Sequence, residues 1–250
     1  MTEIKSNMSR MLKDGAIKLN ITLDDKKVEQ LIGYCEILTE TNKTLNLTRI
    51  TEPQDVVTKH FLDSMTPLLT GCVNGRVIDV GTGAGFPGLV LKCVKPDIEL
   101  TLLDSLNKRI GFLKAAADTM GIDENITFLH SRAEDAAQSN EHREKYDTVV
   151  SRAVANLRTL SEWCLPFVKC GGYMLALKGP LADEELENAS GTISALGGEV
   201  TEIFNAEIPF TDLNHKIVVI KKLRRTPSIF PRKGKKATEI PAEIAVKKQK

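Results

Sequence analysis

The stretch "VIDVGTGAGFPG", Val77 to Gly88, decides the fold. An apolar run ends in an acid and gives way to closely spaced glycines, at Asp79, Gly81, Gly83, Gly85 and Gly88. A short apolar run followed by a glycine-rich turn is typical of a buried strand that leads into a helix, with the turn free to approach a ligand closely. The stretch therefore predicts the first strand of an α/β sheet and a binding loop after it.

Two classes of ligand use such a loop. The glycines from Gly83 onward satisfy the dinucleotide fingerprint Gly-x-Gly-x-x-Gly, and Asp104 follows about 20 residues later at a predicted strand end. Asp79 adds the pattern Asp-x-Gly-x-Gly-x-Gly, which resembles motif I of methyltransferases that use S-adenosylmethionine (AdoMet). An acidic loop suits the ammonium and sulfonium charges of AdoMet, whereas Pro87 removes a helix N–H that a pyrophosphate would use. AdoMet is favoured, and a dinucleotide stays open.

Beyond Arg76, short β-type runs alternate with helical segments. The predicted strands span residues 76–80, 98–104, 126–130, 146–152, 172–179, 199–208 and 215–222. The predicted helices span residues 85–95, 106–120, 156–167 and 181–196, with a short one after Arg132. This alternation requires right-handed crossovers and a mainly parallel sheet with helices on both faces. Only "PFTDLN" separates the last two strands, which suits an antiparallel hairpin.

The expected architecture is thus a Rossmann-like α/β fold with a seven-stranded, mainly parallel sheet and a C-terminal antiparallel hairpin. It resembles the class I AdoMet-dependent methyltransferase fold. Residues 1–75 form an N-terminal helical cap, with a capping-box-like start at Thr22 and a further helix that Pro53 opens. Residues 76–222 form the AdoMet-binding domain, and residues 223–250 form a basic, flexible tail.

The tail carries most of the charge asymmetry. The net charge is +1, yet Lys221 to Lys250 hold eleven basic and two acidic residues, which leaves residues 1–220 at −8. Such a terminus is either solvated and poorly ordered or a phosphate-binding arm. The segment "RRTPSIFPRKGKK" mixes bases with Pro, Ile and Phe, which favours an arm, with Arg232 and Lys233 as candidate RNA contacts.

Composition places the chain among ordinary soluble proteins. At 250 residues and 42% hydrophobic content, it can bury one sizeable core. The start "MTEIKSNMSR" has no apolar signal region, and no apolar run is long enough to cross a membrane, so we expect a cytoplasmic protein. The five cysteines form no Cys-x-x-Cys pair, and we expect neither a metal site nor disulfides.

Three strand ends supply candidate cofactor contacts. Asp104 ends the second strand, where its carboxylate either accepts hydrogen bonds from ribose hydroxyls or caps the helix that follows. Ala133 and Glu134 follow the third strand, where an adenine amino group would lie, although Glu134 also suits the first turn of a helix. Phe86 lies beside the glycines, either against the ligand or in the core.

Basic residues at later strand ends are candidates for contacts with anions. Arg152 ends the fourth strand, where its guanidinium either binds the AdoMet carboxylate or a phosphate, or pairs with a helix acid. Lys178 ends the next strand and would face the methyl acceptor or solvent. His60 and Asp63 share one helix face, where they either line the mouth of the substrate site or pack the cap onto the sheet.

The fourth strand is followed by "SRAVAN", not by the Asn/Asp-Pro-Pro-aromatic tetrapeptide of exocyclic-amine methyltransferases. No Pro-Cys or Thr-Cys nucleophile of the cytosine-C5 type occurs either. An aromatic ring nitrogen such as guanine N7 needs neither device, because its lone pair attacks a sulfonium methyl without prior deprotonation. Catalysis would then rest on alignment, and we expect no dedicated catalytic residue.

Eight segments in order resemble one family, the bacterial small-subunit rRNA guanine-N7 methyltransferases (RsmG, or glucose-inhibited division protein B). They are "NLT" (46–48), "KHFLDS" (59–64), "DVGTGAGFPG" (79–88), "DSLNKR" (104–109), "RAED" (132–135), "SRAVA" (151–155), "ALKG" (176–179) and "PRKG" (231–234). The resemblance implies an AdoMet donor and methylation of guanine N7 at position 527 of 16S rRNA. It also implies cofactor contacts at Gly81, Phe86, Ala133, Glu134 and Arg152, with Asp104 at the ribose. The loop glycines Gly83 and Gly85 are expected to contact the cofactor as well.

The resemblance further implies 16S rRNA, or an assembly intermediate of the small subunit, as the partner of a monomeric enzyme. Two alternatives stay open from the residues alone. One is an NAD-dependent oxidoreductase, which the dinucleotide fingerprint allows. The other is a non-catalytic RNA-binding factor for ribosome assembly on the same fold.

Overall fold

The computed structural model describes residues 3–232. In this part of the chain, seven strands form a sheet in the order β3-β2-β1-β4-β5-β7-β6. Their bounds are β1 (Arg76–Val80), β2 (Glu99–Asp104), β3 (Ile126–His130), β4 (Tyr146–Arg152), β5 (Val168–Lys178), β6 (Gly198–Glu207) and β7 (Asn214–Lys222). Strands β1 to β5 pair in parallel, and β7 pairs antiparallel with both β5 and β6. The predicted fold class is confirmed.

Strand β5 starts earlier than predicted. It begins at Val168 rather than Gly172, and its register against β4 shifts after Tyr146. Gly171 has a φ of +87°, and a Cβ on Gly172 would lie 2.6 Å from the carbonyl oxygen of Asp147. The two glycines therefore form an irregular stretch within the strand. The sequence predicts the start of the strand at this pair because glycine is unfavourable inside a strand.

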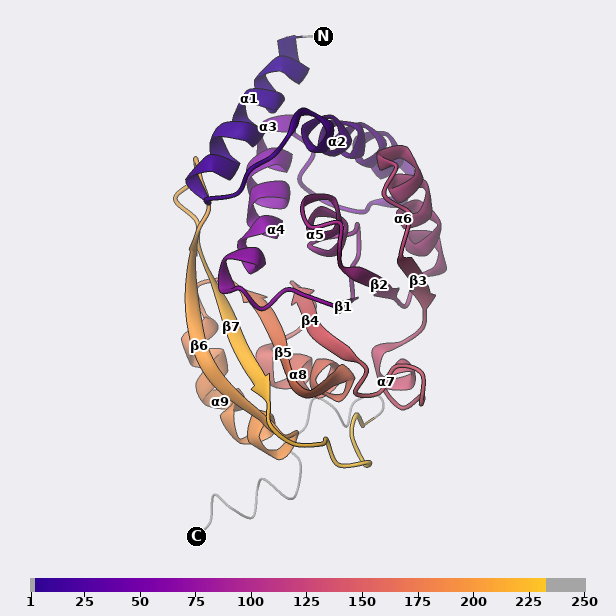
Figure 1. Ribbon diagram of the computed structural model, residues 1–250, viewed down its shortest axis with the longest axis vertical. Coiled ribbons are helices and arrows are strands. Elements are labelled where there is room, and N and C mark those ends of the chain that lie inside the picture. Colours follow the sequence, from indigo (N-terminus) through magenta and orange to yellow (C-terminus); the bar gives the residue numbers. More distant parts are fainter. Residues whose placement is uncertain (1–2, 233–250) are drawn as a thin grey trace.

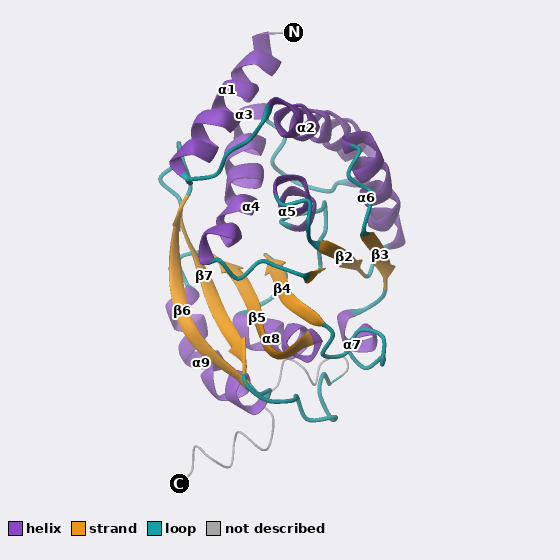
Figure 2. Ribbon diagram, in the orientation of Figure 1, coloured by secondary structure: helices purple, strands orange, loops and turns teal. Residues whose placement is uncertain are grey.

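Helices cover both faces of the sheet (Figures 1 and 2). One face carries α5 (Gly88–Val94), α6 (Asn107–Met120) and the N-terminal helices, and the other carries α7 (Ala133–Ala136), α8 (Leu157–Cys164) and α9 (Ala182–Ala195). Consecutive strand residues point to opposite faces, so Val77 joins the first core and Ile78 the second. Helix α5 starts at Gly88 and not at Gly85, because Gly85 has a φ of +93° that a right-handed helix excludes.

The N-terminal cap contains α1 (Glu3–Lys18), α2 (Asp25–Leu45), α3 (Pro53–Asp55) and α4 (Asp63–Met65). A π-helical segment (Val56–Leu62) joins α3 to α4, and a 3₁₀ turn (Thr66–Thr70) follows. The predicted second helix is therefore one continuous helical segment that changes from α to π, back to α and then to 3₁₀ geometry. Asp24, not Thr22, caps α2, because its carboxylate accepts a hydrogen bond from the Lys27 amide. The cap shares one hydrophobic core with α5, α6 and the sheet.

Residues 223–232, here called the strap, lie against the body and so differ from the flexible tail expected from residue 223. The Thr226 amide donates to Glu144 Oε1 at 2.8 Å, and Arg143 donates to the Phe230 carbonyl at 2.8 Å. The Phe230 side chain is buried in the core to which α8 and α9 contribute. Arg232 ends the strap in a bidentate pair with Glu162. These contacts fix the part of the tail that contains Ile229 and Phe230.

Phe230→Ala should lower the free energy of unfolding by about 3 kcal/mol or more, because it leaves a cavity where the strap enters the core. Its neighbour Ile229 is 53% exposed, and Ile229→Ala should change that free energy by less than about 0.5 kcal/mol. Urea denaturation of both variants measures the difference. Equal effects of the two substitutions would show that the strap does not contribute to the core.

Candidate active site

A buried carboxylate fixes the shape of the glycine loop between β1 and α5. Asp79 has no exposed surface, and its Oδ2 accepts hydrogen bonds from Thr82 Oγ1 at 2.7 Å and from the Gly88 amide at 2.9 Å. Burial raises the pKa of this carboxyl to about 6, against the lowering effect of these hydrogen bonds. Asp79 does not line the pocket described below. The acidic residue of this motif therefore lies behind the loop, and its contacts are those of a loop anchor.

The glycines of the loop serve different purposes. Gly81 and Gly83 adopt positive φ values of +72° and +60° and line the pocket, and a Cβ on Gly83 would stand in open space. Gly85 does not line the pocket, because a Cβ there would lie 2.5 Å from Tyr34 Oη. Tyr34, from the cap helix α2, donates its hydroxyl hydrogen bond to the Ala84 carbonyl. Gly85 is thus required by the packing of the cap, not by the pocket.

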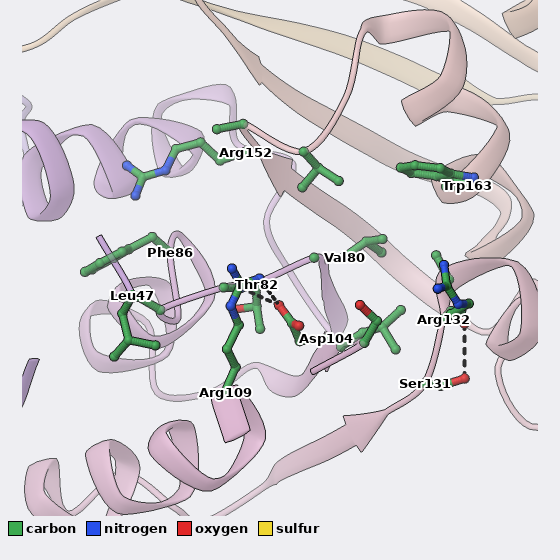
Figure 3. A pocket seen from close by; sticks show the side chains of 18 of the residues that line it. Leu47, Val80, Thr82, Phe86, Asp104, Arg109, Ser131, Arg132, Arg152 and Trp163 are labelled. Carbon is green, nitrogen blue, oxygen red and sulfur yellow. Dashed lines mark hydrogen bonds and ion pairs between the residues drawn. The ribbon is translucent and has the colours of Figure 1, made fainter. Parts of the chain in front are cut away.

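A pocket of about 430 Å³ lies at the carboxyl ends of β1, β2 and β4. Seven of the eight expected cofactor residues line it: Gly81, Gly83, Phe86, Asp104, Ala133, Glu134 and Arg152. Figure 3 shows Phe86 and Arg152 at one side of this pocket and Trp163 and Arg132 at the other. We call it the cofactor pocket.

Several side chains that line the cofactor pocket were not expected there, among them Leu47, Thr48, Arg109, Arg132 and Trp163. Trp163 comes from α8, whose sequence indicates only a helix that packs on the sheet. The chain has a single tryptophan, but nothing in its spacing relates it to the glycine loop. Thr48 and Arg109 lie in "NLT" and "DSLNKR", two segments that carry the family resemblance. The sequence therefore held a signal from which these two pocket residues could have been predicted.

Asp104 contacts the start of the helix that follows it, which is one of the two roles considered for it, and it also lies at the pocket wall. Its Oδ1 accepts a hydrogen bond from the Leu106 amide at 2.9 Å, at the start of α6. Its Oδ2 accepts from the Gly83 amide at 3.0 Å and from Arg109 at 3.2 Å, so it also ties the glycine loop to β2. Each carboxylate oxygen has about two acceptor sites, so Oδ1 keeps capacity for a ligand hydroxyl. Asp104 is 3% exposed and lies at the pocket wall.

Arg152 forms an ion pair with a helix acid, which is one of the two predictions made for it, and this pair is buried. Its guanidinium donates to Asp63 Oδ2 at 2.6 Å, with side-chain exposures of 14% and 2%. The guanidinium carbon also lies 5.1 Å from the Phe86 ring centroid. His215 Nδ1 lies 2.8 Å from the other Asp63 oxygen. Burial alone would raise the pKa of Asp63, but the His215 hydrogen bond and the Arg152 charge lower it.

His60 is buried between these groups as a neutral ring. Its ring stacks on Phe86 with centroids 4.4 Å apart, and burial, reinforced by the Arg152 charge, lowers its pKa to about 3. Arg152 lies 3.2 Å from His60 Nδ1 and can only donate, so Nδ1 accepts. The ring proton then sits on Nε2, which donates to Thr48 Oγ1 at 2.9 Å. The contacts of His60 thus fix one tautomer.

A second cavity of about 610 Å³, the acceptor pocket, shares His60, Arg152, Ala153 and Val154 with the cofactor pocket. Of the expected substrate residues, His60 and Lys178 line it. Arg232 lines neither pocket and is engaged by Glu162 in the strap, while Lys233 lies outside the described residues.

The described residues contain no group of three or more His, Cys, Asp or Glu side chains that could hold a metal ion. Nor does any helix within residues 3–232 have the length and apolar character to span a membrane. The five cysteines are free thiols, and Cys170 is the exposed one among them.

The strand order, the glycine loop after β1 and the pocket at the strand ends define a class I AdoMet-dependent methyltransferase. TrmN from Thermus thermophilus shares the fold, with a TM-score of 0.50 and 20% identity over 67% of this chain and 53% of that one. The family described as GidB, rRNA small subunit methyltransferase G, matches residues 27–214. The chain belongs to this family.

Curated relatives match almost end to end. The ribosomal RNA small subunit methyltransferase G of Alkaliphilus oremlandii is 52% identical over 233 residues, which are 92% of this chain and 97% of the relative. Its counterpart in Alkaliphilus metalliredigens is 49% identical over 225 residues, 89% of this chain and 94% of the relative.

The neutral state of His60 predicts acid sensitivity. Its folded pKa of about 3 lies below the ordinary 6.5, so the unfolded chain binds a proton first, and stability is lost as pH falls from 6.5 towards 3. Between about pH 6 and pH 4, the loss from this group is on the order of 2 kcal/mol. His60→Gln should remove that part of the slope of unfolding free energy against pH. His130→Gln, at an exposed histidine, is the control, and identical slopes in both variants would contradict the buried neutral assignment.

Proposed function

We propose that this protein transfers the methyl group of AdoMet to N7 of guanine 527 in 16S rRNA. We further propose that it acts as a monomer in the cytoplasm, on 16S rRNA or on an assembly intermediate of the small subunit. The relatives named ribosomal RNA small subunit methyltransferase G support the rRNA substrate. The single observation that carries the chemistry is a glycine-lined cofactor pocket that opens beside a second pocket.

The residues of the cofactor pocket fit AdoMet. Gly81 and Gly83 would lie against the methionine end, where the missing side chain of Gly83 leaves room for a ligand and that of Gly81 makes room for Val154. Asp104 would accept from the ribose, and Ala133 and Glu134 would border the adenine. AdoMet supplies an electrophilic methyl group on a sulfonium. Arg152, although paired with Asp63, still faces the pocket and would lie near the AdoMet carboxylate.

Methylation of guanine N7 requires positioning of the acceptor but no general base. The N7 lone pair is free at neutral pH, so no side chain needs to remove a proton before attack. His60 is neutral, but its Nδ1 is occupied by Arg152 and its Nε2 by Thr48, so it is placed to shape the wall rather than to transfer protons. Such a site can accelerate the reaction by aligning donor and acceptor and by excluding water.

The glycine loop gives a direct test of the cofactor. Gly83→Val should abolish AdoMet binding, because the new side chain would stand in the open space of the pocket. Gly121→Val is a matched control, since Gly121 has the same φ of +60° and open surroundings at the end of α6, away from the pocket. Both variants should lose about 1–2 kcal/mol of stability to backbone strain. Titration calorimetry with AdoMet and with NAD measures binding; unimpaired affinity in Gly83→Val, or a preference of the unmodified protein for NAD, would overturn the assignment.

The acceptor is tested in the cell. Borohydride and aniline treatment cleaves 16S rRNA at N7-methylguanine, and deletion of the gene should remove one cleavage, at position 527. The cleavage should return with the intact gene and fail to return with the Gly83→Val variant. A pattern that deletion leaves unchanged would exclude the proposed activity and favour a non-catalytic role in ribosome assembly.

A further inference from the structure

We propose that Lys178 and Glu185 form a donor–acceptor pair that reads the Watson–Crick edge of the acceptor guanine. This inference rests on the proposed function and adds the residues that select the base. The pair lies at the end of β5 and in the first turn of α9, and both side chains line the acceptor pocket but not the cofactor pocket.

The pair is held in place by backbone groups. Lys178 Nζ lies 2.7 Å from Glu185 Oε2 and also donates to the Ala155 carbonyl. Glu185 Oε2 in turn accepts from the Leu157 amide at 2.6 Å, at the start of α8. Fixed partners on both sides lower the entropic cost of holding two long side chains in one geometry. With side-chain exposures of 8% and 28%, the pair is much drier than a surface ion pair.

Capacity for a ligand remains on both members of the pair. An ammonium has three donors, and the described contacts of Lys178 use two of them. Both described contacts of Glu185 fall on Oε2, which leaves Oε1 as an acceptor. A donor therefore stands beside an acceptor at the wall of the pocket.

This arrangement complements guanine and not adenine. Along its Watson–Crick edge, guanine presents the O6 acceptor followed by the N1–H and N2–H donors. Lys178 would donate to O6, and Glu185 would accept from N1–H and from the exocyclic amino group. Adenine presents a donor at N6 and an acceptor at N1, so both contacts would be reversed. A site built to satisfy specific polar groups rejects an analogue that lacks them, because its own polar groups are then left unpaired.

The placement of the pair also orients the base for methylation. The wall shared with the cofactor pocket is formed by His60, Arg152, Ala153 and Val154, whereas Lys178 and Glu185 line only the acceptor pocket. In a purine, N7 and the N1–N2 edge lie on different sides of the ring system. A guanine held at the pair by its Watson–Crick edge therefore turns its N7 side away from the pair, towards the shared wall.

The remaining walls of the acceptor pocket suit the faces of a planar base. Ile50, Val154 and Leu177 supply apolar surface from the cap, the loop after β4 and the end of β5. The other lysine and arginine side chains of this pocket are paired: Lys59 with Asp55 and Arg152 with Asp63, which also contacts His215. A neutral lining of this kind favours an uncharged base over a phosphate, which would ask for unpaired cations.

The test compares acceptor bases in one position. 16S rRNA is ligated with guanine or inosine at the target position and assayed both naked and in reconstituted subunits. Inosine keeps N7, O6 and N1–H but lacks the exocyclic amino group. The unmodified protein should prefer guanine over inosine by about tenfold or more in kcat/KM, the size expected for one charge-assisted hydrogen bond. Glu185→Gln should reduce that preference to about threefold or less and leave AdoMet affinity unchanged.

Asp183→Asn is the matched control, because Asp183 lies in the same first turn of α9 but pairs with Lys216 on the surface and lines neither described pocket. It should keep the full preference for guanine. The same ratio is measured as equilibrium affinity for the two RNAs, which requires no turnover even if Glu185→Gln is slow. An unchanged ratio in Glu185→Gln, or a Glu185→Gln variant that no longer binds AdoMet, would overturn the pair as a base reader. Failure of the unmodified protein to methylate either RNA would instead overturn the proposed function.

Discussion

The buried carboxylate of Asp79 is the constraint on which the site depends. A loop that turns from β1 into α5 within a few residues leaves amides without sheet or helix partners, and each unpaired buried amide would cost about 1–3 kcal/mol. Asp79 pairs with the Gly88 amide that opens α5 and with the Thr82 hydroxyl inside the loop. Asp104 pairs with the Gly83 amide from the neighbouring strand. Two carboxylates, one behind the loop and one at its edge, thus set the backbone that lines the cofactor pocket.

The N-terminal cap depends on the same loop. Tyr34 reaches from α2 to the Ala84 carbonyl, and its ring packs against Phe61 and Phe86. Phe86 in turn carries His60 on its face and lies under Arg152. An aromatic cluster therefore joins the cap, the glycine loop and the wall between the two pockets. The cap is part of the site, and its position cannot change without moving that wall.

The strands and the closing antiparallel pair depend mainly on local sequence patterns and could therefore be predicted. Alternating apolar runs predicted the strands to within a few residues, and the short connection "PFTDLN" predicted the antiparallel pair that closes the sheet. What failed depends on contacts between distant segments. Asp79 follows a ligand-binding pattern but is buried behind the loop. Gly85 is required by the close approach of Tyr34, and Trp163 lines the pocket because α8 packs against the sheet. The strap is likewise held by Arg143, Glu144 and Glu162. Nothing in the sequence around these three residues indicates that they bind residues 223–232.

The charge arrangement of the acceptor pocket matches the reaction we propose. Transfer of a methyl group from a sulfonium to a neutral N7 moves one positive charge and creates none, so a site for it needs no strong net potential. The pocket meets this condition by pairing the lysine and arginine side chains among its lining residues with carboxylates: Arg152 with Asp63, Lys178 with Glu185 and Lys59 with Asp55. An unpaired arginine at the shared wall would instead oppose the approach of a cationic sulfonium in a low-dielectric pocket. Asp63 therefore has an electrostatic consequence as well as a structural one, since it lets Arg152 hold His60 and Phe86 in place without leaving its charge uncompensated beside the transferring methyl.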